Sequence, residues 1–187
     1  MKGPDDILRF WFSAEAEKHW FKSTDAFDAQ IRREFEPLAM SLAADLSSSR
    51  GVHSWEREGP EAHLALIIAL DQFPRNMYRD TPAAFAWDAF ALKAAKRMVE
   101  RKTDIHLSQN QRPFAYMPLM HSEALPDQEA CVALCDGRLD DGNTLKFAEI
   151  HRDIIKRFGR FPHRNKILGR ETLPEEQAFL DNGGFSG

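Results

Sequence analysis

The sequence has only two cysteines, Cys131 and Cys135, among 187 residues, so a framework of disulfide bonds is excluded. The two thiols lie four residues apart in a predicted helix. No second pair of thiols and no nearby histidine completes the tetrahedral set that zinc requires. We therefore predict that both cysteines are small core residues, and we expect no metal and no cofactor.

Long hydrophobic runs are also absent. The longest apolar stretch, Leu64 to Leu70, is far too short to cross a bilayer. Asp5, Asp6 and Arg9 interrupt the N-terminal region, where a secretory signal would need an unbroken apolar run. We therefore expect a cytoplasmic protein that has no membrane partner.

An excess of positive charge is lacking as well, because 25 Lys and Arg residues face 29 Asp and Glu residues, a formal net charge of −4. General electrostatic binding to nucleic acid needs a basic surface, so we expect no nucleic acid partner. Familiar catalytic signatures are missing too: the Gly-x-Ser-x-Gly elbow, the glycine-rich phosphate loop and the paired-histidine zinc helix. An enzyme with this sequence would be unconventional.

What the sequence does contain is typical of a globular protein. Hydrophobic residues make up 43% of the chain and charged residues 29%, and 14 Phe and 4 Trp make the predicted core strongly aromatic. The length suits a single domain, residues 1–187, with a substantial core. The surplus of Phe and Trp also leaves room for the apolar face of a homodimer.

Helical periodicity dominates the chain, and no stretch alternates with the period of two that strands require, so the predicted fold class is all-α. Thr81 before Pro82 predicts the start of a helix that runs to about Lys102. Thr172 has a glutamate three residues later, the spacing of a capping box, and predicts a last short helix. The other predicted helices run from Asp5 to Phe12, from Asp25 to Leu46 with a break or kink at Pro37, from Gly59-Pro60 to near Gln72, from Arg112 to Ser122, from Pro126 to Asp136 and from Asn143 to Gly159. We expect an irregular stack of about eight or nine helices in antiparallel hairpins, because no 34-residue repeat is present.

A short motif occurs twice, as Phe73-Pro74-Arg75-Asn76 and as Phe161-Pro162-His163-Arg164-Asn165, the second time with an inserted histidine. Each copy is predicted to follow an apolar helix that carries a polar residue on its central face, Asp71 in one and His151 in the other. This arrangement indicates a site but does not name a reaction. Asn76 and Asn165 are each expected to bond the local backbone.

Three predicted helices place one titratable side chain on an apolar face. Asp71 lies seven residues after Leu64, His121 lies seven residues after Phe114, and His151 is surrounded by the apolar residues of its own helix. Buried polar groups must be paired. Either each is satisfied separately, with the histidines bonded to backbone carbonyls, or all three form one polar cluster. An aspartate beside a histidine would fix the imidazole tautomer and raise its basicity, as a general base requires.

The segment from His151 to Arg170 is strongly basic, although the chain is acidic elsewhere. Pro162 is predicted to start a helix, which would place His163 and Arg164 in a first turn where the helix dipole disfavours cations. Either internal carboxylates compensate, or arginine side chains and backbone N–H groups hold a bound anion. The internal carboxylates that could do so are Asp71, Glu123 and Glu149.

Several blocks of sequence carry a resemblance to a known family. These blocks are Leu8–Phe12, Trp20-Phe21, Leu70–Asn76, Phe114–Glu123 and His151–Arg170. With them the chain resembles, over nearly its whole length, the bacterial family known as domain of unknown function 924. The resemblance implies an all-helical fold like that of the tetratricopeptide superfamily. It implies no activity.

Three hypotheses for the function follow. The first is a cytoplasmic helical binding protein with a polar, partly cationic pocket for a small anionic ligand or an acidic peptide end. The second is an unconventional hydrolase that uses Asp71 with His121 or His151 as acid and base. The third is a protein–protein scaffold in which the motif residues are internal struts. The candidate catalytic residues are Asp71, His121 and His151, and the candidate ligand-binding residues are Arg75, Asn76, Glu123, Arg152, Arg157, Arg160, His163, Arg164 and Asn165.

Overall fold

The computed structural model describes residues 2–185. Within that range the chain forms nine α-helices and four short 3₁₀ helices and has no strand, which confirms the prediction of an all-α fold. The α-helices are α1 (Pro4–Trp11), α2 (Ala14–Glu17), α3 (Asp25–Ser48), α4 (Pro60–Met77), α5 (Asp88–Glu100), α6 (Arg112–Met120), α7 (Leu125–Arg138), α8 (Gly142–Phe158) and α9 (Pro174–Asp181). The 3₁₀ helices are η1 (Ser54–Arg57), η2 (Pro82–Phe85), η3 (Asp104–His106) and η4 (Pro162–Arg164).

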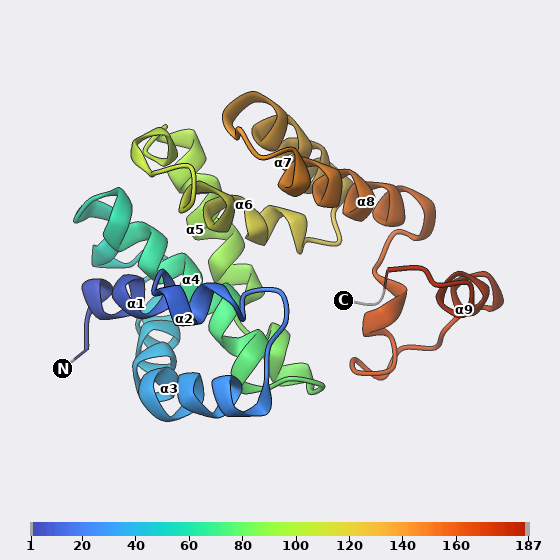
Figure 1. Cartoon of the computed structure of the whole chain (residues 1–187), viewed down its shortest axis with the longest axis horizontal. Coiled ribbons are helices and arrows are strands. Elements are labelled where there is room, and N and C mark those ends of the chain that lie inside the picture. Colours follow the sequence, from blue (N-terminus) through green and yellow to red (C-terminus); the bar gives the residue numbers. More distant parts are fainter. Residues whose placement is uncertain (1, 186–187) are drawn as a thin grey trace.

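Helix α4 lies at the centre of the fold. Each of its residues from Leu64 to Leu70 is completely buried. A helix that is apolar on all sides needs neighbours on all sides. Helices α1, α3, α5 and α6 supply them (Figure 1). The central position of α4 means that a polar side chain on it, such as Asp71, is surrounded by other helices.

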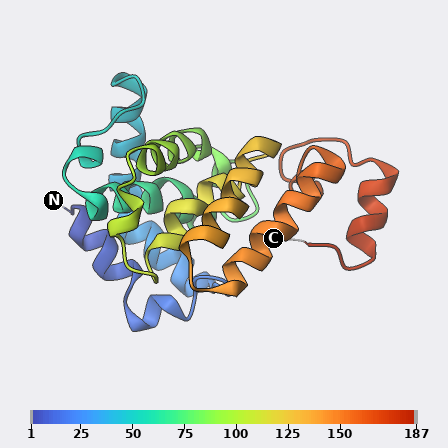
Figure 2. The same ribbon diagram turned by 90° about the horizontal axis from the view of Figure 1, so that it is seen from above.

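The chain after α5 continues as a row of packed helices, α6 against α7 and α7 against α8. The segment after Gly159, which includes α9, lies at one end of the molecule in both views (Figures 1 and 2). A small apolar cluster joins this segment to α8, and it is formed by Ile154 and Ile155 of α8 together with Phe161. Next to this cluster, Arg164 of η4 donates a hydrogen bond to the backbone carbonyl of His121 at the end of α6.

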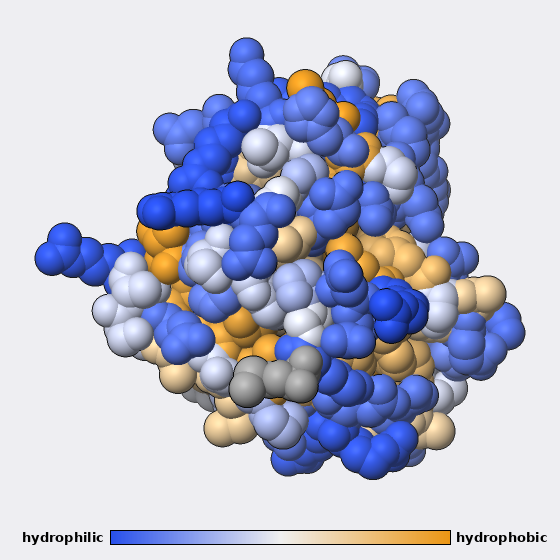
Figure 3. Space-filling model, turned by 90° about the vertical axis from the view of Figure 1, so that its left-hand side faces the viewer, coloured by the Kyte–Doolittle hydropathy of each residue, from blue (hydrophilic) through white to orange (hydrophobic). Residues whose placement is uncertain are grey.

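The surface around the N-terminal helices is mostly hydrophilic, with hydrophobic residues between the charged ones (Figure 3). Among the described residues, no helix is both long and apolar enough to cross a membrane.

The two copies of the repeated motif have different conformations. The helix that was predicted to end near Gln72 continues to Met77, so Phe73-Pro74-Arg75-Asn76 lies inside α4 rather than after it. Phe73 and Pro74 are buried there, and this burial favours continuing the helix through the proline. The second copy lies outside the α-helices, because Gly159 ends α8 in a left-handed conformation. Its central residues form the 3₁₀ helix η4.

Three other features differ from the predicted boundaries. Of the break or kink predicted at Pro37, the break is absent from α3, because this proline faces solvent and water can hydrate the carbonyl that lost its donor. The predicted helix from Thr81 to Lys102 is divided into η2 and α5. The last helix is capped at Leu173, whose N–H donates to Glu176 at 2.8 Å, and not at Thr172.

Gly159 and Gly137 allow a matched test of the end of α8. Gly159 has φ = 70°, where a side chain is strained although there is open space around it. Replacing it with alanine is expected to lower the free energy of unfolding by about 1 kcal/mol. Gly137→Ala, in α7 with a right-handed backbone and equally open space, is expected to raise it by up to about 1 kcal/mol. Urea denaturation of both variants measures the difference, and equal effects would contradict the strain at Gly159.

Candidate functional site

A buried carboxylate on α4 meets a histidine at the end of α6. Asp71 is 1% exposed, and its Oδ1 accepts a hydrogen bond from Nδ1 of His121 at 2.9 Å. Its Oδ2 accepts from Gln72 at 2.6 Å. Burial acts to raise the pKa of Asp71, but the charge of Arg75 and the bond from His121 outweigh it and hold that pKa below its ordinary value. Asp71 is therefore ionised near neutral pH.

The ionised carboxylate determines the tautomer of His121. A carboxylate can only accept, so Nδ1 carries the hydrogen and Nε2 keeps its lone pair. Burial and the positive charge of Arg75 lower the pKa of His121, so the ring is neutral at pH 7. The side chain of His121 is 17% exposed, and no described residue is hydrogen-bonded to Nε2. The basic nitrogen is thus reachable from solvent.

Arg75 is held by carboxylates on both sides. It lies one helical turn after Asp71 and donates to its backbone carbonyl at 2.6 Å. Its two terminal nitrogens donate to Asp88 of α5 at 2.8 and 3.0 Å. For Arg75, the expected bridge from an arginine to internal carboxylates is therefore present, and its charge is compensated without a ligand.

Arg164 of η4 has no such partner. The residue is 7% exposed, and its NH1 donates to the backbone carbonyl of His121 at 3.0 Å. Its guanidinium carbon lies 4.9 Å from the ring centre of Phe85 and 4.4 Å from that of Phe161. No carboxylate among the described residues forms an ion pair with it within 4.0 Å, and Nε is buried without a hydrogen-bond partner. Burial and repulsion by Arg75 lower the pKa of Arg164 to about 10, so it remains charged at pH 7.

His151 does not join the pair of Asp71 and His121. Its Nδ1 lies 2.8 Å from the backbone carbonyl of Phe147 in its own helix, as the simpler of the two interpretations expected for a histidine. Its ring packs against Phe161 and against Phe185 near the end of the chain. Burial lowers its pKa to about 4. The expected shared cluster of three titratable groups therefore forms only for the other two.

His163 lies close to the same aromatic rings. Its ring centre is 5.5 Å from those of Phe161 and Phe185. Burial and the adjacent charge of Arg164 lower the pKa of His163 to about 4. Its Nδ1 is buried and has no hydrogen-bond partner in the described part of the chain.

Glu123 connects the end of α6 to the second motif. Its carboxylate accepts two hydrogen bonds from Arg170, at 2.7 and 2.9 Å, and one from the backbone N–H of Phe161 at 2.8 Å. Arg170 also donates to the side-chain oxygen of Asn165 at 3.0 Å. Glu123 therefore fixes the ring on which Arg164 stacks, and does not itself contact Arg164 within ion-pair distance.

Glu176 of α9 holds the same motif from the other side. Its carboxylate accepts from Arg160 at 2.6 and 2.8 Å and from the side-chain amide of Asn165 at 3.1 Å. Arg160 and Asn165 are thus occupied by an internal partner. The expectation that Asn165 bonds the local backbone is wrong, because its amide joins Glu176 to Arg170.

Asn76 also differs from expectation. Its side-chain amide donates to Asp28 of α3 at 2.7 Å and to Ser23 at 3.1 Å, instead of bonding its own backbone. It ties α4 to the start of α3.

The remaining two basic candidates lie on α8, away from these contacts. Arg152 pairs with the adjacent Asp153 at 2.8 Å, and Arg157 is exposed with its guanidinium carbon 4.6 Å from the ring centre of Phe158. Arg152 also lines a surface hollow of about 580 Å³ between α7 and α8. The basic side chains of this segment therefore have different environments. Some bond to internal carboxylates, some are exposed to solvent, and that of Arg164 is buried.

The comparisons with known proteins cover nearly the whole chain. Residues 7–184 match the family described as bacterial protein of unknown function (DUF924). The chain belongs to this family. The DUF924 chain is also similar to the solved structure of a protein of unknown function, ATU0120 from Agrobacterium tumefaciens, with 39% identity and a TM-score of 0.85. That similarity covers 96% of the DUF924 chain and 97% of the other chain, whereas no curated protein matches.

Sequence reasoning missed three residues that shape the DUF924 site. Asp88 begins α5 and compensates Arg75, but no spacing links it to α4. Phe85 is a partly exposed residue of η2 that stacks on Arg164. Arg170 was counted only as part of the basic segment, although its guanidinium donates two hydrogen bonds to Glu123. Only Arg170 carried a signal in the sequence, namely an unexplained positive charge.

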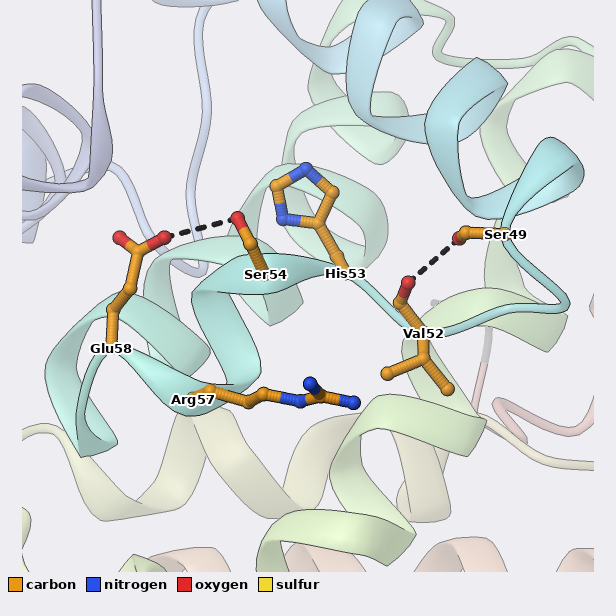
Figure 4. Close-up of a pocket in the computed structure, with 6 residues that line it drawn as sticks. All are labelled: Ser49, Val52, His53, Ser54, Arg57 and Glu58. Carbon is orange, nitrogen blue, oxygen red and sulfur yellow. Dashed lines mark hydrogen bonds between the residues drawn. The ribbon is translucent and has the colours of Figure 1, made fainter.

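The rest of the DUF924 protein offers a surface hollow but no metal centre among the described residues. Among the described residues, no group of three or more His, Cys, Asp or Glu side chains is arranged to hold a metal ion. A separate hollow of about 490 Å³ lies near η1 (Figure 4). Two hydrogen bonds join residues that line it, from Ser54 to Glu58 at 3.0 Å and from Ser49 to the carbonyl of Val52 at 2.7 Å. The hollow is lined by Ser49, Val52, His53, Ser54, Arg57 and Glu58.

Proposed function

We propose that the protein is a cytoplasmic binding protein whose ligand is a small anionic molecule or an acidic peptide end. The observation that carries the proposal is the buried guanidinium of Arg164, for which the described residues provide no carboxylate within 4.0 Å. A buried charge is costly unless it is compensated, and removal of one partner from a buried pair typically costs 3–5 kcal/mol, roughly, in other proteins. A carboxylate or phosphate group would supply the missing partner.

The surroundings of Arg164 support an anion rather than a cation. Arg75 and the neutral ring of His121 lie beside it, and both are partly exposed. Repulsion by Arg75 contributes to the lowered pKa of Arg164, so the two positive charges are near each other. A negative group placed between solvent and Arg164 would be attracted mainly by Arg164, because Asp71 and Asp88 already compensate the charge of Arg75.

The arrangement of the helices also suits a binding protein. We propose that the packed pairs α3/α4, α4/α5, α6/α7 and α7/α8 form a tetratricopeptide-like stack, as the family resemblance implies. Stacked helical hairpins commonly offer binding surfaces. A fold of this kind is compatible with many ligands, so the ligand class is inferred from Arg164 alone.

The test measures anion binding by wild type and by an Arg164→Met variant. Adipate, a dicarboxylate, and inorganic phosphate serve as probes in thermal unfolding and titration calorimetry of the full chain. At ten times the dissociation constant, a bound anion should add about 1.4 kcal/mol, which is a rise of about 3–6 °C in Tm. The rise should be absent in Arg164→Met and present in Arg157→Met, which removes an exposed arginine of the same segment.

The same variant separates binding from a purely structural role. If Arg164 were an internal strut of a scaffold, Arg164→Met would lower the Tm in the absence of any anion. Under our proposal the loss of two cation–π contacts, about 1–2 kcal/mol each, is offset by removing an uncompensated buried charge. We therefore expect a Tm close to that of wild type. An equal response of both proteins to adipate and phosphate would refute the proposal.

A further inference from the structure

The basic nitrogen of His121 lies next to the proposed anion site. Arg164 donates to the backbone carbonyl of His121 itself, so a group bound by Arg164 is held beside that residue. Nε2 points away from the bond to Asp71, because the two ring nitrogens lie on different edges of the imidazole. A neutral, solvent-reachable imidazole nitrogen next to a cation that has no carboxylate partner in residues 2–185 is the arrangement of a base that acts on an anionic substrate.

Asp71 gives this histidine the properties of a positioned base. The carboxylate holds the ring by its Nδ1–H and would stabilise the imidazolium that forms when Nε2 takes a proton. Gln72 and Arg75 in turn fix Asp71, so the base and the residue that orients it are both held on packed helices. These bonds go beyond what is needed to satisfy one buried polar group.

Among the nucleophilic side chains of the described residues, Ser122 and the two cysteines are not placed to attack a substrate. Ser122 follows His121 directly, but its hydroxyl donates to Asp127 at 2.8 Å. Cys131 and Cys135 are buried in the core, and burial together with the neighbouring thiol raises the pKa of Cys131. The group that His121 can activate is therefore a water molecule from solvent.

We propose that Asp71 and His121 form a general-base dyad that hydrolyses an ester whose acyl part carries a carboxylate bound by Arg164. The proposal rests on the proposed function, because Arg164 supplies the substrate anchor. His121 is the catalytic residue, and Asp71 is a positioning residue that acts through it.

The reaction balances without a further reactant. Nε2 of His121 removes a proton from water while the water oxygen bonds to the ester carbonyl carbon. The tetrahedral intermediate then collapses, the bond from carbon to the alcohol oxygen breaks, and the imidazolium returns its proton to that oxygen. The products are a carboxylic acid, which ionises, and an alcohol.

The experiment compares two chromogenic esters with the full chain. Mono-4-nitrophenyl adipate carries the carboxylate, and 4-nitrophenyl hexanoate is the neutral control. For the adipate ester we expect saturable release of 4-nitrophenolate with a kcat about 100-fold above that of His121→Gln. The rate should rise with pH and level off below pH 7, because the neutral imidazole is the active form and the pKa of His121 is lowered. His106→Gln, which removes an exposed histidine, should leave the rate unchanged.

Variants of the anchor and of the positioning residue give different results. Arg164→Met should raise KM for the adipate ester and leave the slow reaction of the hexanoate ester unchanged. Asp71→Asn should lower kcat and also move the pH midpoint downward, because the charge of Asp71 and its bond both raise the pKa of His121. A merely structural role of Asp71 would change the amount of folded protein without moving that midpoint.

The outcomes distinguish this proposal from the proposed function. If unlabelled adipate raises the Tm through Arg164 but wild type and His121→Gln hydrolyse the ester equally, the dyad is overturned and anion binding stands. If adipate and phosphate leave the Tm unchanged in wild type and in Arg164→Met, anion binding fails and the dyad fails with it. A rate that depends on His121 but has no preference for the adipate ester would overturn the role of Arg164 as anchor.

Discussion

Acidification from pH 7 to pH 4 is expected to lower the free energy of unfolding by about 8 kcal/mol, through three histidines. Burial lowers the pKa of His63, of His151 and of His163 from 6.5 to about 4 in the folded protein. In the unfolded chain all three bind a proton as the pH falls below 6.5, whereas the folded protein does so only near pH 4. The unfolded state therefore binds more protons in this window, and each histidine removes up to about 3 kcal/mol by pH 4.

This loss is large compared with the stability of a typical domain, about 5–15 kcal/mol. Carboxylates contribute in the same direction but at lower pH. The pKa of Glu123 is held below its ordinary 4.5, although burial acts to raise it, because Arg170 and the N–H of Phe161 bond to it. Its stabilisation is present above pH 4.5 and is lost only as the pH falls through the lowered value. The decline between pH 6.5 and pH 4.5 thus belongs to the histidines.

Urea denaturation as a function of pH tests the assignment. His151→Phe cannot take a proton, so it should recover about a third of the loss between pH 7 and pH 4, even though it is less stable at pH 7 without the bond to Phe147. His106→Gln removes an exposed histidine and should leave the pH dependence as in wild type. A His151→Phe variant with the same pH dependence as wild type would show that this histidine is not held neutral by burial.

Glu123→Ala is expected to lower the free energy of unfolding by about 2–3 kcal/mol. The change removes a two-pronged ion pair with Arg170 that is partly screened, since the two side chains are 28% and 24% exposed. It also leaves the N–H of Phe161, a fully buried residue, without its acceptor. Because Phe161 stacks on Arg164, anion binding should weaken as well.

Chemical denaturation at pH 7 measures the first effect and calorimetric titration with adipate measures the second. Glu171→Ala is the matched control, because Glu171 is an exposed acid of the same region. Glu123→Gln keeps an acceptor for Phe161 and should cost less than the alanine change. Equal stabilities of Glu123→Ala and Glu171→Ala would contradict the described network.

The parts of this structure that depend on periodicity could be predicted from the sequence. The seven-residue spacing from Leu64 to Asp71 correctly indicated a buried aspartate, because the apolar face of a helix repeats at that interval. The sequence named His121 and His151 as possible partners of Asp71, but the choice between them could not be predicted, because only packing of α4 against α6 brings His121 close. His151 is buried, as its apolar surroundings predicted, but its bond is to its own helix.

The repeated motif shows why similar local sequences can fold differently. Both copies contain Phe-Pro, yet one is a turn of a buried helix and the other is a 3₁₀ helix after a left-handed glycine. The surrounding residues determine which conformation each copy adopts, since Phe73 is enclosed by the main core and Phe161 belongs to the smaller cluster. Tertiary packing of this kind overrides local preference, so a repeat in the sequence did not imply a repeat in the structure.

The bonds from Arg160 and Asn165 to Glu176 allow the last helix, α9, to affect ligand affinity from a distance. Arg164 lies in a turn whose neighbours Arg160 and Asn165 are both fastened to α9. Opening of α9 would loosen that turn, and ligand binding to the closed form would in turn stabilise α9, since the two equilibria are linked. Substitutions at the end of the chain can therefore adjust affinity while every residue at the site itself stays the same.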